Sequence, residues 1–116
     1  MARREKFGEF VRRERVVKDI GLREMAKLIQ VSPTYLSKVE RNEFPPPAED
    51  RVKAIAKILG SNVDELLALA GRVSSDLTDI IKGKPRVLAD FLRVAKGLTA
   101  EDMKRLSRQA KKAKDK

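Results

Sequence analysis

Apolar residues recur at intervals of three and four along nearly the whole of this 116-residue chain. No segment shows the apolar and polar alternation of a half-buried β-strand. The three-and-four spacing places the apolar side chains of each segment on one face of a helix, and glycine or proline separates most of the segments. The sequence therefore predicts an all-α protein.

Five helices are predicted in the first part of the chain. The first would turn Val17 inward, together with Phe7, Phe10 and Val11. Asn62 would cap the fifth helix, because its side chain can accept a hydrogen bond from a free amide of the first turn. The predicted ranges are about 5–18, 22–29, 33–41, 48–59 and 63–70.

Three further helices are predicted in the rest of the chain. Ser75 would cap the first of them, and Pro85 would open the second, since proline suits the first helical position. Thr99 would cap the third, with Asp102 at the spacing of a capping box.

The chain has no cysteine and no histidine. Disulfides and thiolate chemistry are therefore excluded, and the commonest general base and metal ligand is missing. No serine, lysine or carboxylate is arranged as a nucleophile with a base, and neither a glycine-rich phosphate loop nor metal-ligand spacing is present. The sequence predicts that the protein is not an enzyme and has no catalytic residue, metal site or cofactor.

Basic side chains outnumber acidic ones by 27 to 17, which gives a net charge of +10. Residues 1–42 carry 11 basic and 6 acidic side chains, residues 43–71 carry 3 and 5, and residues 72–116 carry 13 and 6. An excess of this size in a small protein points first to nucleic acid, because neutralising phosphates releases counterions.

Two basic segments have their own interpretations. Arg3, Arg4 and Lys6 either contact phosphates or the minor groove as an arm, or remain as solvated charge. We expect the lysine-rich residues 111–116 to keep the protein soluble.

No apolar run approaches the roughly 18 residues that cross a bilayer, and the N-terminus lacks the apolar core of a signal peptide. We therefore expect a soluble, cytoplasmic protein with no membrane partner.

Residues 31–47, VSPTYLSKVERNEFPPP, contain a short helix with marked ends. Ser32 can accept hydrogen bonds from the free amides of the first turn, and Pro33 suits the first helical position. The three prolines at 45–47 cannot continue a helix. The outward side of this bounded helix carries hydroxyl and basic groups.

This helix and the one before it are joined by three residues, which is the anatomy of a helix-turn-helix. The segments GLREMAKLIQVSPTYLSKVERNEFPPP and AIAKILGSNVDELL resemble the phage repressor and Cro type of helix-turn-helix regulator, also called the xenobiotic response element family. The resemblance covers about residues 5–71. It implies a five-helix, lambda-repressor-like domain that binds double-stranded DNA with the helix over 33–41 in the major groove.

The resemblance also implies roles for individual side chains. Thr34 and Lys38 would face base edges, with Ser37 beside them; a lysine can donate to guanine O6 and N7, and a threonine offers a hydroxyl and a methyl group. Thr34 and Ser37 are also common residues near the start of a helix. The alternative is therefore that they only favour helix formation and do not contact DNA. Glu40 would form a semi-buried ion pair with Arg15. The side chains implied at the DNA backbone or its edge are Tyr35, Arg41, Arg23, Ser32 and Asn42.

Three positions depart from the family pattern. Gln30 stands where the turn usually has glycine, so a left-handed backbone there would be less favourable in energy. Leu22 stands where a glutamine that touches phosphate is common. Asn42 replaces the common glycine after the third helix, but asparagine tolerates the left-handed conformation almost as well.

We expect a DNA-binding domain over residues 1–71 and a C-terminal extension of two or three helices over residues 72–116. A single helix-turn-helix contacts too few base pairs to be selective, so these proteins usually work as two-fold dimers on palindromes. The extension has more apolar side chains than a tail needs, and they would either form the dimer interface, as we expect, or pack back on the first and fifth helices. The predicted interface residues are Leu77, Ile80, Ile81, Leu88, Phe91, Leu92, Met103 and Leu106.

The predicted function is sequence-specific transcriptional regulation by a homodimer on a palindromic operator, most simply repression by occlusion. The alternative is an antitoxin, or a repressor controlled by a peptidase, whose C-terminal helices bind a partner protein. An RNA-binding role is disfavoured, because most of the four phenylalanines lie at core spacing and leave no platform for stacking bases.

Overall fold

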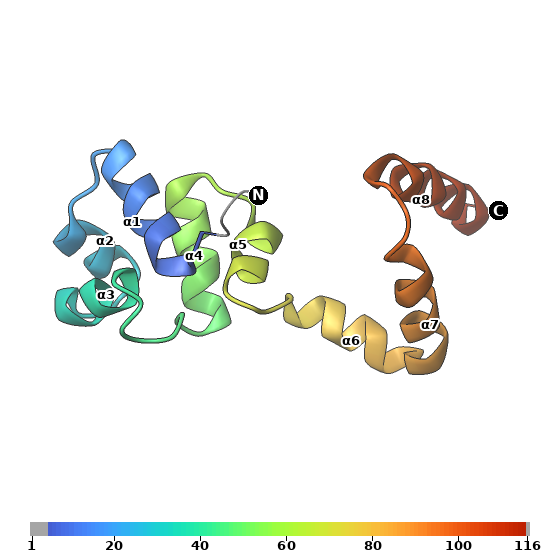
Figure 1. Ribbon diagram of the computed structural model, residues 1–116, viewed down its shortest axis with the longest axis horizontal. Helices are drawn as coiled ribbons and strands as arrows, with labels where there is room; N and C mark the ends of the chain where they lie inside the picture. The colour runs from blue at the N-terminus through green and yellow to red at the C-terminus, as the bar shows by residue number, and fades with distance from the viewer. Residues whose placement is uncertain (1–4, 116) are drawn as a thin grey trace. The chain divides into compact units, whose positions relative to one another are not determined.

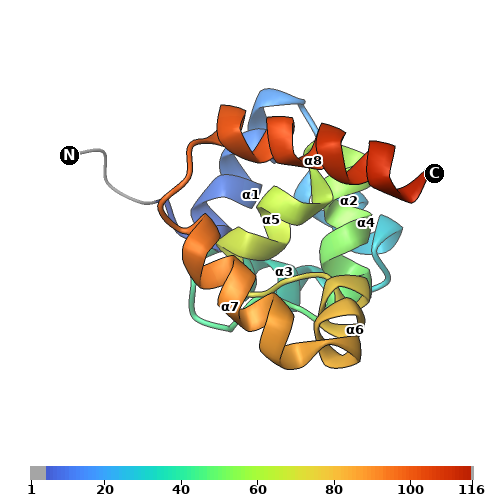
Figure 2. The same cartoon turned by 90° about the vertical axis from the view of Figure 1, so that its right-hand side faces the viewer.

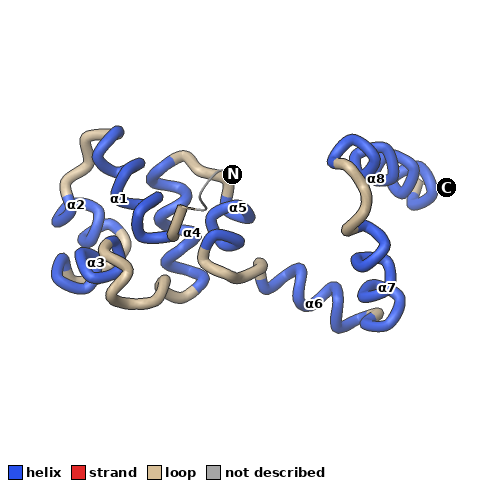
Figure 3. Tube along the Cα trace, in the orientation of Figure 1, coloured by secondary structure: helices blue, strands red, loops and turns tan. Residues whose placement is uncertain are grey.

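The computed structural model describes residues 5–115, and within this range the chain is entirely helices and loops. Figures 1 and 3 show the helices and the short loops that connect them. The prediction of an all-α protein is confirmed. The helices of the described range are α1 (Phe7–Val17), α2 (Leu22–Leu28), α3 (Pro33–Glu40), α4 (Glu49–Leu59), α5 (Val63–Leu69), α6 (Ser75–Gly83), α7 (Pro85–Ala95) and α8 (Ala100–Lys114).

The chain forms two compact units, of which the first ends at Ser74 and the second begins at Ser75. The first unit contains α1 to α5 around one apolar core. In it α4 contacts both α1 and α5, and α3 contacts both α1 and α2 (Figures 1 and 2). The buried core residues are Phe7, Val11, Met25, Ala26, Ile29, Leu36, Val39, Val52, Ile55, Ala56, Leu59, Leu66 and Leu67.

Local sequence signals set several helix ends of the first unit. Ser32 Oγ accepts the backbone N–H of Tyr35 over 3.1 Å at the start of α3, and Asn62 Oδ1 accepts the backbone N–H of Glu65 over 3.0 Å at the start of α5. Gly60 ends α4 with a φ of 68°, in the left-handed region that glycine enters without a steric cost. These contacts confirm the caps that the sequence predicts.

The prediction that Val17 lies inward was wrong. Val17 is the last residue of α1, and its side chain is 71% exposed. The chain reverses at Asp19, which has a φ of 56°, and Ile20 rather than Val17 packs against the core. α1 does extend to Val17, but the apolar periodicity does not show where along the helix the core ends.

In the second unit α6 contacts α7, and Pro85 opens α7 as predicted. Ser75, predicted as the cap of α6, is instead its first residue, and the buried Ser74 precedes it. The capping box of α8 is formed: Thr99 Oγ1 accepts the backbone N–H of Asp102, and Asp102 Oδ2 accepts the backbone N–H of Thr99, each over 3.1 Å. The hydrogen bond from the Thr99 backbone N–H lowers the pKa of the Asp102 carboxyl, because it favours the ionised form.

Large apolar side chains remain exposed in the second unit. Ile80 on α6 is 58% exposed, and both Phe91 and Leu92 on α7 are 50% exposed. None of the helices in residues 5–115 combines the length and the apolar character needed to span a bilayer.

Candidate nucleic-acid interface

The turn between α2 and α3 reverses the chain at Gln30. This residue has a φ of 60°, in the left-handed region where glycine is usual. The backbone N–H of Val31 donates to the carbonyl of Ala26 over 2.9 Å, and the Arg51 guanidinium donates to the carbonyl of Gln30 over 3.4 Å. Ala26 is fully buried and small, so the two helices can lie close together here.

α3 has one side in the core and one side that faces away from it. Leu36, Val39 and Glu40 are buried, whereas Thr34 is exposed and Lys38 is partly exposed. Residues four apart lie on the same side of a helix, so Thr34 and Lys38 share the outward side. The other side chains of α3 that the sequence predicts at DNA are also partly exposed: Tyr35 and Ser37.

The side chains predicted at the DNA backbone differ in their exposure and in the hydrogen bonds that they already make within the protein. Arg23 is exposed in the first turn of α2. Arg41 is exposed after α3, where its guanidinium donates to the Ser37 carbonyl over 3.4 Å and lies 3.3 Å from a carboxylate oxygen of Glu43. The Ser32 hydroxyl oxygen already accepts the α3 capping hydrogen bond, which leaves its proton as the group that can contact a phosphate.

Arg15 of α1 and Glu40 of α3 form a bidentate ion pair, which joins the two side chains that the family resemblance pairs. The distances are 2.8 Å from Arg15 Nε to Glu40 Oε2 and 2.9 Å from Nη2 to Oε1. A third N–H of the guanidinium donates to the Ile20 carbonyl over 2.8 Å. The Arg15 side chain is 11% exposed and that of Glu40 is 4% exposed. The hydrogen bond to Glu40 raises the pKa of the Arg15 guanidinium further above its ordinary value.

Gly8 of α1 lies against the end of α3, a contact that sequence reasoning missed. Its backbone N–H donates to Asn42 Oδ1 over 3.1 Å. A Cβ atom added to Gly8 would lie 2.3 Å from the carbonyl oxygen of Val39 and 2.7 Å from that of Glu40. Only glycine fits here. Asn42 is predicted at the DNA backbone. Its amide oxygen is used inside the protein, which leaves its amide nitrogen to contact DNA.

Phe44, which sequence reasoning also missed, lies beside the outward side of α3. Lys38 Nζ is 5.1 Å from the centroid of the Phe44 ring. The ring of Tyr35 is tilted against that of Phe44, with 5.9 Å between the centroids. Phe44 lies after the end of α3, so helical spacing does not relate it to Tyr35 and Lys38. The sequence pattern therefore gave no indication of these contacts.

The chain is similar to known helix-turn-helix proteins. The helix-turn-helix family model matches residues 11–66. The clp gene regulator ClgR from Corynebacterium glutamicum is 34% identical over 59% of this chain and 87% of that chain, with a TM-score of 0.48. The chain belongs to the phage-repressor-like helix-turn-helix family.

Two further solved structures are similar to this helix-turn-helix protein. SinR of Bacillus subtilis, a master regulator for biofilm formation whose structure is in complex with DNA, is 30% identical over 53% of this chain and 97% of that chain, with a TM-score of 0.48. The DNA-binding domain of the P22 C2 repressor is 29% identical over 57% of this chain and 86% of that chain, with a TM-score of 0.51. No curated protein sequence matches the chain. The family is one of DNA-binding transcriptional regulators and is not a class of enzymes.

In the helix-turn-helix unit the loop after α3 is bound by Arg72, a residue that lies 26 positions after Pro46 in the chain. The guanidinium of Arg72 donates to the Pro46 carbonyl over 2.9 Å and to the Pro47 carbonyl. Arg72 follows α5 in the chain, so this contact joins the end of the unit to the proline segment. Pro46 and Pro47 are thus fixed in position, although α3 itself already ends at Glu40.

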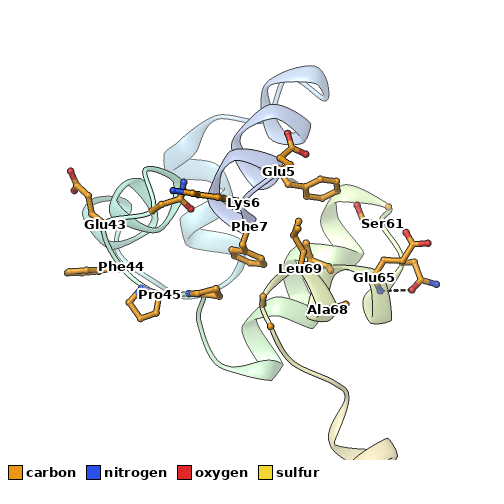
Figure 4. A pocket seen from close by; sticks show the side chains of 18 residues that line it. Glu5, Lys6, Phe7, Glu43, Phe44, Pro45, Ser61, Glu65, Ala68 and Leu69 are labelled. Atoms are coloured by element: carbon orange, nitrogen blue, oxygen red, sulfur yellow. Dashed lines mark hydrogen bonds between the residues drawn. The ribbon is translucent and has the colours of Figure 1, made fainter. Parts of the chain in front are cut away.

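An apolar groove of about 1120 Å³ opens beside the same loop (Figure 4). The start of α1, the loop after α3, and α5 with its flanking residues form its walls. Phe44 and Pro45 line one end, and Ala68 and Leu69 line the α5 side.

The basic N-terminus is only partly described. Arg3 and Arg4 lie outside the described residues, and Lys6 is exposed immediately before α1. Within residues 5–115 no group of three or more acidic, histidine or cysteine side chains is placed to hold a metal ion.

Proposed function

We propose that this regulator is a repressor that binds a palindromic operator as a homodimer, with α3 in the major groove of each half-site. The observation that supports it best is the two-sided α3: Glu40 and the apolar residues fix it to the core, while Thr34 and Lys38 face away. A helix presented in this way can enter the major groove with its N-terminal half against base edges. The P22 C2 repressor, which the chain resembles, has a DNA-binding domain of this family.

In this proposal the outward side chains of α3 and of Arg41, which follows it, divide into two groups. Thr34 and Lys38, with Ser37 beside them, read bases, and Lys38 donates to guanine O6 and N7. Tyr35 and Arg41 lie towards the phosphates. Arg23, Ser32 and Asn42 contribute further phosphate contacts, the last through its amide nitrogen. Phosphate contacts fix the register on DNA, and base contacts supply the sequence preference.

Lys38→Ala should relax base preference, because it removes a base contact worth about 1 to 3 kcal/mol of discrimination. Arg41→Ala should instead weaken binding to every sequence and reduce the slope of log K against log salt by about one. Duplexes selected by the wild-type protein from a random pool supply the operator, and affinities for the operator, its single-base variants and random DNA are measured over a range of salt. Lys57→Ala, which removes an exposed lysine on α4, is the matched control. Equal losses on operator and random DNA for both Lys38→Ala and Arg41→Ala would contradict the assignment.

The homodimer is proposed from the exposed apolar side chains of α6, α7 and α8. Leu77 and Met103 are 40% and 41% exposed, in addition to the more exposed Ile80, Phe91 and Leu92. Ile81, Leu88 and Leu106 of the predicted interface are partly buried within the chain. Apolar side chains at this density stabilise an interface when a second copy covers them.

Phe91→Asp should shift the protein towards monomer, because it places a charge in the proposed interface. Sedimentation equilibrium measures the change in mass, and operator affinity should fall with it. Arg93→Asp, a change on the other side of α7, is the control and should leave the mass unchanged. A Phe91→Asp protein with the wild-type mass would contradict the dimer. A monomeric wild-type protein that retains a second protein from its host through this face would favour the partner-binding alternative.

A further inference from the structure

Phe44 is in contact with the side chain to which base reading is assigned above. The ammonium of Lys38 lies over the Phe44 ring at 5.1 Å from the centroid, and the Tyr35 ring contacts Phe44 in a tilted arrangement. A cation within about 6 Å of an aromatic face is attracted by the ring quadrupole. The ring is 41% exposed, so it is open to solvent and is not simply core packing.

The backbone fixes where this ring stands. The carbonyl of Lys38 accepts the backbone N–H of Glu43 over 2.9 Å and that of Phe44 over 3.3 Å. Asn42 makes the required turn with a φ of 61°. Arg72 holds the carbonyl of Pro46 beyond it. Phe44 is therefore placed relative to Lys38 by main-chain hydrogen bonds and not by its side chain alone.

We propose that Phe44 is a positioning residue for Lys38 and, through it, sets the base preference of α3. The proposal rests on the proposed function, in which Lys38 reads bases. A lysine side chain is a flexible stem, and ordering it on binding costs affinity. A ring that already holds the ammonium lowers this cost and restricts which base the ammonium reaches. The contact uses the ring face, and the ammonium has three N–H donors, so those that do not point at the ring remain available for a base.

The test compares Phe44→Leu, which keeps an apolar side chain but removes the ring, with Phe44→Tyr, which keeps the ring. The probes are duplexes selected from a random pool by the wild-type protein, together with their single-base variants and random DNA. Phe44→Leu should lower discrimination about two- to fivefold at the base positions that Lys38→Met flattens, with a smaller effect on random DNA. Phe44→Tyr should keep the base preference of the wild-type protein.

The double variant separates positioning from direct contact. In the Lys38→Met background, Phe44→Leu should cause no further loss, because the two side chains act as one unit. An equal loss in both backgrounds overturns the proposal, since Phe44 would then contact DNA itself. Loss with Lys38→Met but not with Phe44→Leu also overturns it and leaves Lys38 as the reader. No loss with Lys38→Met overturns the reader assignment and the role of Phe44 together.

A measurement without DNA checks the contact and the folding of each variant. The ring current of Phe44 should shift the Lys38 ε-CH₂ resonance upfield in the wild-type protein and in Phe44→Tyr, and this shift should disappear in Phe44→Leu. Phe10→Leu is the control, because it removes the ring beside Arg13, 5.2 Å from its guanidinium carbon, and leaves α3 untouched. A wild-type protein without the upfield shift overturns the proposal.

Discussion

Glu40→Ala is expected to lower the free energy of unfolding of the helix-turn-helix unit by about 3 to 5 kcal/mol, because it leaves the Arg15 guanidinium in a largely buried site without its carboxylate. Arg15 is only 11% exposed and makes two hydrogen bonds to Glu40. A domain of this size has a total stability of about 5 to 15 kcal/mol, so the variant loses a large part of it. Urea unfolding followed by circular dichroism measures the change.

Two variants test the reason for this loss. Glu43→Ala removes the exposed ion pair with Arg41, in which both side chains are more than half exposed, and should cost less than about 1 kcal/mol. The double variant Arg15→Met with Glu40→Leu removes both charges and should recover much of the stability, because no unpaired charge stays buried. If Glu40→Ala lowers the free energy of unfolding no more than Glu43→Ala does, the ion pair between Arg15 and Glu40 does not stabilise the unit.

The sequence predicts most helix ends correctly where the capping residue and the group that it binds lie within a few residues of each other. Ser75, which is the first residue of α6 and not its cap, is an exception. The caps at Ser32, Asn62 and Thr99 each bind an amide three residues further along the chain. The left-handed end of α4 follows from Gly60 in the same way. Such contacts depend on local backbone geometry, which residue type and spacing largely determine.

Two of the contacts that the sequence did not predict join residues far apart in the chain. Gly8 and Asn42 are 34 residues apart, and Arg72 and Pro46 are 26 apart. Gly8 sits within a helix-forming segment, where nothing marks it as a point of close approach. Phe44 follows a helix as one more apolar residue. The roles of Gly8 and Arg72 depend on how distant segments pack, and that of Phe44 depends on the turn after α3. Apolar periodicity encodes neither.

The Arg15 and Glu40 pair lies between these cases. The two residues are 25 apart, and the resemblance to the family, rather than periodicity, supplied their pairing. The same resemblance marked Gln30 as a departure, and the left-handed φ there shows that the turn keeps its shape with a less suitable residue. Likeness to a family thus predicts long-range contacts as well as local ones, but it did not indicate the contact between Phe44 and Lys38.

The end of α3 is fixed to α1 at two points, and the second point is the more sensitive to substitution. The first is the ion pair between side chains, which can adjust. The second is the approach of Gly8 to the main chain of α3, where an added Cβ would meet two backbone carbonyl oxygens at 2.3 Å and 2.7 Å. Backbone at the end of a packed helix cannot move aside as a flexible side chain can. The separation of α1 and α3 therefore depends on the absence of a side chain at position 8.

Gly8→Ala should therefore destabilise the unit by about 3 kcal/mol, the upper part of the range for overpacked sites, although alanine is the better helix former by about 1 kcal/mol. Urea unfolding again measures the change, and operator affinity should fall further than affinity for random DNA because α3 is displaced. Gly83→Ala in α6, where an added Cβ has no neighbour within 4 Å, should be neutral or slightly stabilising. Asn42→Ala removes the third close atom, Asn42 Oδ1 at 2.6 Å, but should not rescue Gly8→Ala, because both carbonyls remain. Rescue by Asn42→Ala would show that the side chain, and not the main chain of α3, sets the approach of the two helices.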